Sequence, residues 1–156
     1  MSCVFPQGVF APIVTPFQDQ KIQYGAFVEN IERYNATELR GYMPLGSNGE
    51  FQGLTDREML RLLSLMARHK SEDKIVVAGC GRESAYATVS FIKRTADYGL
   101  DYAFVLAPHY FIDRMTDEAI FAYYSYVADF SPLPVVIYNA PKFSSGYLMS
   151  PGLMAR

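Results

Sequence analysis

The segment Gly46-Ser47-Asn48-Gly49-Glu50 gathers small and polar residues between an apolar stretch and an amphipathic one. Glycine permits tight backbone turns, and successive N–H groups together with a hydroxyl and an amide can surround a carboxylate or a phosphate. The segment is therefore a candidate anion site. Serine, asparagine and glycine are also the commonest turn residues, so an ordinary strand-to-helix turn stays open. No G-K-[ST] follows, and this excludes a phosphate-binding P-loop.

Two further segments carry side chains that can transfer protons. Tyr138 precedes Asn139-Ala140-Pro141 and offers a phenol that could relay protons. His109 and Tyr110 offer an imidazole and a second phenol. The structural alternatives are a half-buried packing role for each tyrosine, as for most of the 12 in the chain, and a hydrogen-bonded structural role for His109.

The cysteines and the other histidine are weaker candidates. Cys80 could act as a nucleophile, but no activating arrangement is visible around it. His69 suits a solvated positive charge near the end of a helix. Cys3 and Cys80 are far apart and outside any C-x-x-C spacing, so we expect neither a disulfide framework nor a zinc site. A reduced, intracellular setting fits this cysteine usage best.

The elements that must position these residues follow a repeated plan. Short apolar runs of strand length occupy residues 9–14, 41–45, 74–79, 102–107 and 134–138. Amphipathic stretches with apolar residues three and four apart occupy residues 24–39, 55–70, 84–98 and 116–130, which predicts helices. Thr55 with Glu58 forms a T-x-x-E capping box, and Thr116 followed by two acidic residues suits a second helix start. The last residues, from Leu148, resemble the opening of a fifth helix.

The spacing of the strands defines the fold class. Strand starts recur every 28 to 33 residues, which is the length of one strand-helix unit in a parallel sheet. This pattern predicts an α/β fold, either an open doubly wound sheet of five strands or five units of a (β/α)8 barrel. Ligands bind at the carboxyl ends of the strands in both cases, and all the segments named above follow strands.

Composition narrows the class of protein. The chain has 156 residues, of which 50% are hydrophobic, and a formal net charge of -2. We expect one globular domain over residues 1–156 without an internal boundary, and no nucleic-acid partner because no basic stripe is present. The N-terminus lacks the pattern of a signal or transit peptide, and no apolar run is long enough to span a membrane. These features predict a cytoplasmic protein.

Five segments in order resemble one family, the pyruvate-dependent class I aldolases that include dihydrodipicolinate synthase, N-acetylneuraminate lyase and 4-hydroxy-2-oxoglutarate aldolase. GVFAPIVTPF resembles the first strand of the family, GSNGE its carboxylate-binding G-[ST]-x-G-E turn, and VVAGCG its third strand. LAPHYF resembles its fourth-strand tyrosine motif, and VVIYNAP its Y-N-x-P segment. The resemblance spans nearly the whole chain.

This resemblance implies a TIM barrel and a lyase that forms a Schiff base between a lysine and a 2-oxo acid, without a metal or an organic cofactor. Gly46, Ser47 and Asn48 would hold the carboxylate of pyruvate, and Tyr138 would pass protons to and from the substrate. Tyr110 matches the tyrosine that completes the site of a neighbouring subunit in tetrameric members. Ser47 would connect the two phenols, and the protein would be a homodimer or a homotetramer.

The chain departs from the family at the nucleophile. The Schiff-base lysine lies on the sixth strand, some two dozen residues beyond the Y-N-x-P segment, so the chain resembles the first five of eight units. The lysines that it does contain match no such strand; they are Lys21, Lys70, Lys74, Lys93 and Lys142. Lys142 belongs to the loop after Tyr138. Five units would leave strand edges open and apolar faces uncovered, which predicts poor solubility unless copies associate.

The prediction of the substrate depends on single residues and short stretches that differ between members of the family. Dihydrodipicolinate synthases usually carry an arginine shortly after Y-N-x-P, whereas the segment from Lys142 to Gly146 has none. Asn48 and the stretches RMTDEAI and VADFSPLPVVIY resemble 4-hydroxy-2-oxoglutarate and 2-oxo-3-deoxy-acid aldolases more closely. The synthase and the lyase remain alternatives. Two other classes are a catalytically dead 2-oxo-acid-binding or subunit-interaction module, favoured by the missing lysine, and a nucleotide-binding open sheet, disfavoured by the absence of GxGxxG.

Overall fold

The computed structural model describes residues 6–156 except the side chain of Ile112, so Cys3 lies outside the described residues. The chain divides into two compact units, which are described separately below. The first comprises Met1–Gly79 with Thr95–Tyr102, and the second comprises Cys80–Arg94 with Ala103–Arg156. The expectation of one domain without an internal boundary stays a prediction.

The first unit is built on three parallel strands, β1 (Phe10–Pro12), β4 (Gly41–Met43) and β5 (Ile75–Gly79). β4 lies between the other two, and Tyr42 is in register with Ala11 of β1 and Val76 of β5. All three strands fall within runs predicted from the sequence. An unpredicted antiparallel hairpin, β2 (Phe17–Gln18) and β3 (Lys21–Ile22), follows β1.

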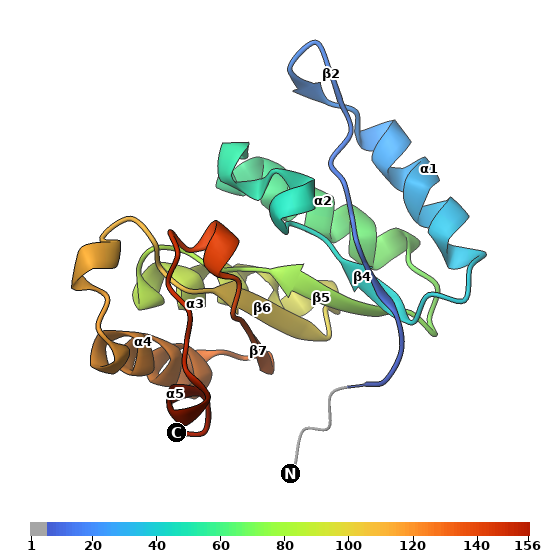
Figure 1. Cartoon of the computed structure of the whole chain (residues 1–156). Helices are drawn as coiled ribbons and strands as arrows, with labels where there is room; N and C mark the ends of the chain where they lie inside the picture. Colours follow the sequence, from blue (N-terminus) through green and yellow to red (C-terminus); the bar gives the residue numbers. More distant parts are fainter. Residues whose placement is uncertain (1–5) are drawn as a thin grey trace. The chain divides into compact units, whose positions relative to one another are not determined.

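Two helices of the first unit cover the strands. α1 (Tyr24–Asn35) packs on α2 (Asp56–His69), and α2 packs on β5 (Figure 1). Their inward faces bury residues at helical spacing: Phe27, Ile31, Leu62, Leu63 and Met66. The predicted capping box is confirmed, because Thr55 accepts a hydrogen bond from the Glu58 N–H while the Glu58 carboxylate accepts one from the Thr55 N–H.

The end of α1 differs from the prediction, which extended the helix to Leu39. The helix ends at Asn35, whose side-chain oxygen accepts hydrogen bonds from the Tyr42 hydroxyl at 2.8 Å and the Ser71 N–H at 3.0 Å. Its side-chain amide donates to the His69 carbonyl at 2.8 Å. Asn35 therefore joins the end of α1 to β4 and to the end of α2.

The second unit contains two parallel strands, β6 (Tyr102–Leu106, whose first residue belongs to the first unit) and β7 (Val135–Tyr138). Its helices are α3 (Ala85–Thr95, shared at its last residue), α4 (Asp117–Phe130) and the short α5 (Pro151–Met154). Thr116 caps α4 by accepting from the Ala119 N–H, as predicted, and Ser150 caps α5 by accepting from the Leu153 N–H. No helix in the described part of the chain has the length and apolarity that crossing a membrane requires.

The burial of the strands differs from one strand to another. Four of the five residues of β6 are buried, as expected for a strand covered on both faces, whereas every residue of β7 is only half-buried. β7 pairs with β6 along one edge, and no strand within residues 6–156 pairs with its other edge. The expectation of an open strand edge is therefore confirmed at β7, and its half-buried residues agree with the expected uncovered faces.

Gly41 gives a test of the packing in the first unit. A methyl group at this position would collide with the Ile75 carbonyl oxygen and approach the Phe10 ring to 2.8 Å. We expect Gly41→Ala to lower the free energy of unfolding by about 1–3 kcal/mol, measured by urea denaturation. The control is Gly25→Ala in α1, where an added methyl meets nothing within 4 Å. Equal stability of the two variants would contradict this packing.

Candidate functional site

The turn after β4 has a strained backbone on both sides of its polar residues. Leu45 and Glu50 are non-glycine residues with positive φ, at 60° and 52°. Between them Ser47–Gly49 forms a 3-10 helix, with Gly49 N–H donating to the Gly46 carbonyl at 3.0 Å. Non-glycine residues in the left-handed region persist only where their surroundings hold them, and they cluster at functional sites.

The turn is held by the segment that follows β1. The buried hydroxyl of Thr15 donates to the Gly49 carbonyl at 2.7 Å. A Cβ at Gly49 would lie 3.0 Å from the Ile13 carbonyl oxygen, so a larger residue would push the turn away from this segment. These contacts explain the second glycine of the motif, and they fix the backbone that carries Ser47 and Asn48.

The polar groups of the turn remain available. Ser47 is half-buried and Asn48 is exposed. Within residues 6–156, the backbone N–H groups and side chains of these two residues have no hydrogen-bond partner. The turn thus presents two backbone donors, a hydroxyl and an amide on a rigid backbone, which suits an anionic ligand such as a carboxylate.

Tyr138 is the last residue of β7 in the second unit. Its ring meets the Phe104 ring edge-on, with centroids 5.7 Å apart, and lies 6.5 Å from the Phe143 ring. The side-chain amide of the next residue, Asn139, donates to the Met149 carbonyl and accepts from the Met149 N–H. The ring is therefore fixed, while its hydroxyl has no partner in the described part of the chain. A fixed phenol with an unpaired hydroxyl can accept and donate a proton.

His109 and Tyr110 lie in the loop after β6, where Glu83 holds both. Glu83 Oε1 lies 2.9 Å from His109 Nδ1, and Glu83 Oε2 accepts from the N–H groups of His109 at 3.1 Å and Tyr110 at 2.9 Å. His109 thus has the hydrogen-bonded structural role that was the alternative to proton transfer. Sequence reasoning missed Glu83, because its partners lie 26 and 27 residues further along the chain.

The predicted site residues fall into two groups. Gly46, Ser47 and Asn48 lie together in one turn of the first unit, whereas Tyr110 and Tyr138 belong to the second. Within the second unit the two tyrosines pack on different rings, Tyr110 on Phe111 and Tyr138 on Phe104 and Phe143. The relay from Ser47 to the two phenols stays a prediction.

Cys80, His69 and Lys74 lie outside the candidate site, and each is buried or paired with a neighbouring group. Burial raises the pKa of the Cys80 thiol to about 12, so this group stays protonated at neutral pH. His69 is half-buried at the end of α2, with Nδ1 3.8 Å from a Glu32 carboxylate oxygen, and its role as a positive charge stays a prediction. Within residues 6–156 Lys74 is the one buried lysine, and its amine donates to the Thr37 carbonyl at 2.9 Å and pairs with Asp73.

The remaining lysines are also placed unlike a Schiff-base nucleophile. Lys70 donates to the Lys74 carbonyl at 2.8 Å, and Lys142 is exposed with its amine 5.7 Å from the centre of the Phe143 ring. Lys21 and Lys93 are exposed. Residues 6–156 contain no cluster of three or more His, Cys, Asp or Glu side chains that could hold a metal ion.

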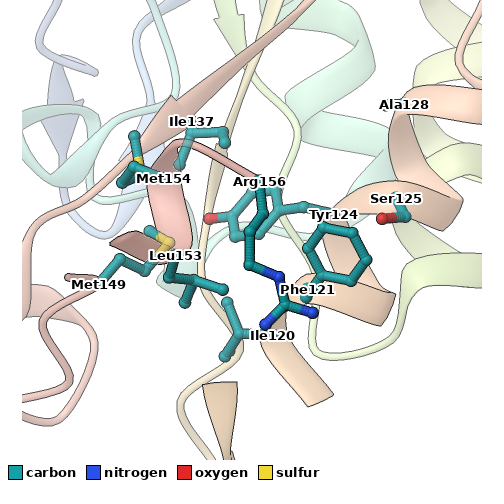
Figure 2. Close-up of a pocket in the computed structure, with 10 residues that line it drawn as sticks. All are labelled: Ile120, Phe121, Tyr124, Ser125, Ala128, Ile137, Met149, Leu153, Met154 and Arg156. Atoms are coloured by element: carbon teal, nitrogen blue, oxygen red, sulfur yellow. The ribbon is translucent and has the colours of Figure 1, made fainter. Parts of the chain in front are cut away.

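A pocket of about 220 Å³ lies between α4, β7 and α5 in the second unit (Figure 2). Its wall is mainly apolar and includes Ile120, Leu153 and Met154. The Tyr124 hydroxyl on this wall donates to the Val105 carbonyl at 2.9 Å, and Arg156 is paired with Glu118. None of the predicted site residues lines this pocket, so it is separate from the candidate chemistry.

The sequence of the chain is similar to those of known proteins. Residues 5–156 match the sequence profile of the dihydrodipicolinate synthetase family. The chain belongs to this family. A 4-hydroxy-tetrahydrodipicolinate synthase from Phenylobacterium zucineum is 32% identical over 89% of this chain and 47% of its own length. Another from Methanothrix thermoacetophila is 30% identical over 96% of this chain and 50% of its own length. The chain thus spans about half the length of these two relatives.

Solved structures carry the same fold. A dihydrodipicolinate synthase from Aquifex aeolicus superposes with a TM-score of 0.87 and 24% identity, covering 95% of this chain and 50% of that one. A 4-hydroxy-tetrahydrodipicolinate synthase from Methylacidiphilum fumariolicum gives a TM-score of 0.83 and 26% identity over 90% of this chain and 46% of that one. The family member described here has the fold of about half of a (β/α)8 barrel, which confirms the predicted TIM-barrel class over the open sheet.

Thr15 gives a test of how the turn is held. Thr15→Val keeps the shape of the side chain and leaves the Gly49 carbonyl without its donor, so we expect a loss of about 1–3 kcal/mol in the free energy of unfolding. The control is Thr37→Val, which removes an exposed hydrogen bond to the Tyr34 carbonyl. Urea denaturation measures both. A cost for Thr15→Val no greater than that for Thr37→Val would contradict the anchoring role.

Proposed function

We propose that this chain supplies the carboxylate-binding turn and the proton-relay tyrosine of a pyruvate-dependent class I aldolase. The observation that carries the proposal is the turn at Gly46–Glu50. It is strained and anchored, and it presents unpaired donors at Ser47 and Asn48 in a chain of the dihydrodipicolinate synthetase family. A 2-oxo acid such as pyruvate has the carboxylate that these donors fit.

The proposed mechanism uses a covalent imine. A lysine amine adds to the 2-oxo carbon of the substrate to give a carbinolamine, and loss of water gives a protonated imine. When the carbon–carbon bond next to the imine carbon's neighbour breaks, the imine accepts the bonding electron pair and becomes an enamine; in the reverse direction the enamine carbon donates this pair to an aldehyde and the imine forms again. Gly46, Ser47 and Asn48 hold the carboxylate in place during these steps. Tyr138 passes protons to and from the carbinolamine and the substrate, with Ser47 and Tyr110 as the other members of the relay. No metal or organic cofactor takes part.

The finer proposal concerns the substrate. We place the protein with the aldolases that act on 4-hydroxy-2-oxoglutarate or 2-oxo-3-deoxy acids, because no arginine occurs between Lys142 and Gly146. The relatives named above carry the name 4-hydroxy-tetrahydrodipicolinate synthase, which supports the alternative. Turnover of purified protein with 4-hydroxy-2-oxoglutarate, and with pyruvate plus aspartate semialdehyde, distinguishes the two. We propose a cytoplasmic homodimer or homotetramer.

A second candidate function is a catalytically inactive module that binds a 2-oxo acid or another subunit. The lysines favour it, because Lys74 is buried in contacts with Thr37 and Asp73 and none of the others lies in a barrel strand. Pyruvate affinity without turnover is the result that this candidate predicts.

Reductive trapping tests the covalent step. We expect incubation with pyruvate and borohydride to leave the 156-residue chain at its mass of 17.6 kDa, because none of its lysines matches the nucleophile. A form of the protein that also carries the Schiff-base lysine should gain one reduced pyruvyl group, read from the intact mass. Borohydride without pyruvate is the control. A form that carries this lysine and stays unmodified would contradict the aldolase proposal.

Substitution of the relay residues tests their roles in such a lysine-bearing form. Tyr138→Phe removes only the hydroxyl, and we expect it to lower kcat by about 10²-fold or more, in the range of general acid-base effects. Ser47→Ala should lower kcat and weaken the affinity for pyruvate together, because this residue serves both the relay and the carboxylate. Near-normal turnover of Tyr138→Phe, or a Ser47→Ala variant that only melts earlier, would overturn these assignments.

A further inference from the structure

The loop after β6 is fastened to the rest of the second unit by the carboxylate of Glu83. One carboxylate oxygen lies 2.9 Å from His109 Nδ1, and the other accepts from the N–H groups of His109 and Tyr110 at 3.1 and 2.9 Å. Hydrogen bonds to an ionised carboxylate are stronger than neutral ones. A single side chain thus fixes two consecutive residues of the loop.

A second contact holds the same loop from another side. Ser145 Oγ, in the segment that follows β7, donates to the His109 carbonyl at 3.2 Å. The backbone of His109 is therefore bound through both its N–H and its C=O. Together these contacts bind the backbone and imidazole of His109 but only the N–H of Tyr110, so the Tyr110 side chain takes no part in them.

The side chains of the loop present a contrast with its fixed backbone. Tyr110 is 77% exposed and Phe111 is 63% exposed. The two rings meet edge-on with centroids 4.8 Å apart. An aromatic pair held in place at the surface is typical of residues that contact another molecule, because such residues lose little additional conformational freedom on binding.

The usual structural reason for a glutamate at this position does not apply. Glu83 lies just before α3, where an acidic side chain could cap the helix. Ser84 takes that role, since its hydroxyl accepts from the Ala87 N–H at 3.1 Å and its carbonyl accepts from the Thr88 N–H at 3.0 Å. Within residues 6–156, the hydrogen bonds and the ion pair of Glu83 all go to the loop after β6, and its charge also acts on the Tyr123 hydroxyl.

We propose that Glu83 is a positioning residue that sets the orientation of Tyr110. The inference rests on the proposed function, in which Tyr110 takes part in the proton relay and completes the site of a neighbouring subunit. Glu83 touches no substrate. It acts by fixing the backbone from which the Tyr110 ring extends, so that the phenol is already oriented when it reaches its partner.

Amide exchange at His109 and Tyr110 in the 156-residue chain tests the inference directly. We expect Glu83→Ala to speed hydrogen exchange at both amides by about tenfold or more, measured by NMR, because both lose their acceptor. Both amides donate to the same carboxylate oxygen, so the second variant is Glu83→Asp, whose shorter side chain draws that oxygen away from the loop and should also speed exchange at both amides. The matched control is Glu72→Ala, which removes an exposed carboxylate that has no partner within residues 6–156.

A second readout follows the ring itself. In protein labelled with 3-fluorotyrosine, the Tyr110 signal is assigned by its loss in Tyr110→Phe, and it should move toward the position of free fluorotyrosine in Glu83→Ala but not in Glu72→Ala. Unchanged exchange and an unchanged Tyr110 signal in a folded Glu83→Ala would overturn the inference. Should Glu83→Ala fail to fold, unchanged amides in Glu83→Asp would overturn it.

Kinetics separate this inference from the function on which it rests. In a lysine-bearing form, Glu83→Ala should lower kcat and leave the KM for pyruvate unchanged, because Tyr110 serves the relay and not the carboxylate. Faster amide exchange with unchanged kcat would support the positioning of Tyr110 and overturn its role in the relay. Normal exchange in the variant would overturn the positioning role, whatever the kinetics.

Discussion

Parallel pairing of the strands is the constraint on which the candidate site depends. Parallel neighbours place their carboxyl ends at the same edge of a sheet. In the first unit this brings the segment after β1 beside the turn after β4, so that Thr15 can hold Gly49. In the second unit it brings the loop after β6 beside the segment after β7, so that Ser145 can bind the His109 carbonyl. Loops that begin at one sheet edge can thus support each other.

This support allows the turn at Gly46–Glu50 to hold an unfavourable backbone. Leu45 and Glu50 both have positive φ, and each such residue costs about 1–2 kcal/mol. The contacts of Gly49 with Ile13 and Thr15 oppose relaxation of the turn. The result is a set of polar groups that is oriented before any ligand arrives. Orientation in advance is what a carboxylate site needs if binding is to be specific.

The features that could be predicted from the sequence are those encoded locally. The capping box of Thr55 and Glu58, the cap at Thr116 and the strand-helix alternation all arise from residues a few positions apart. The motif residues were also predictable as candidates, because Ser47, Asn48 and Tyr110 follow strands and Tyr138 ends one.

The features that could not be predicted depend on contacts between distant residues or on unusual turn residues. The end of α1 is set by Asn35 and its bonds to Tyr42 and Ser71. The hairpin of β2 and β3 turns through Asp19 and Gln20, both at positive φ, without the glycine that usually marks such a turn. The role of Glu83 follows from partners 26 and 27 residues away.

The central claim is that pyruvate binds at the turn after β4, and an NMR titration of the 15N-labelled chain tests it most directly. The account predicts that added pyruvate shifts the amide signals of Ser47 and Asn48 first and in a saturable manner, and that lactate, which lacks the 2-oxo group but keeps the carboxylate, shifts the same signals. Saturable shifts confined to other residues, or no shift at either amide, would contradict the account.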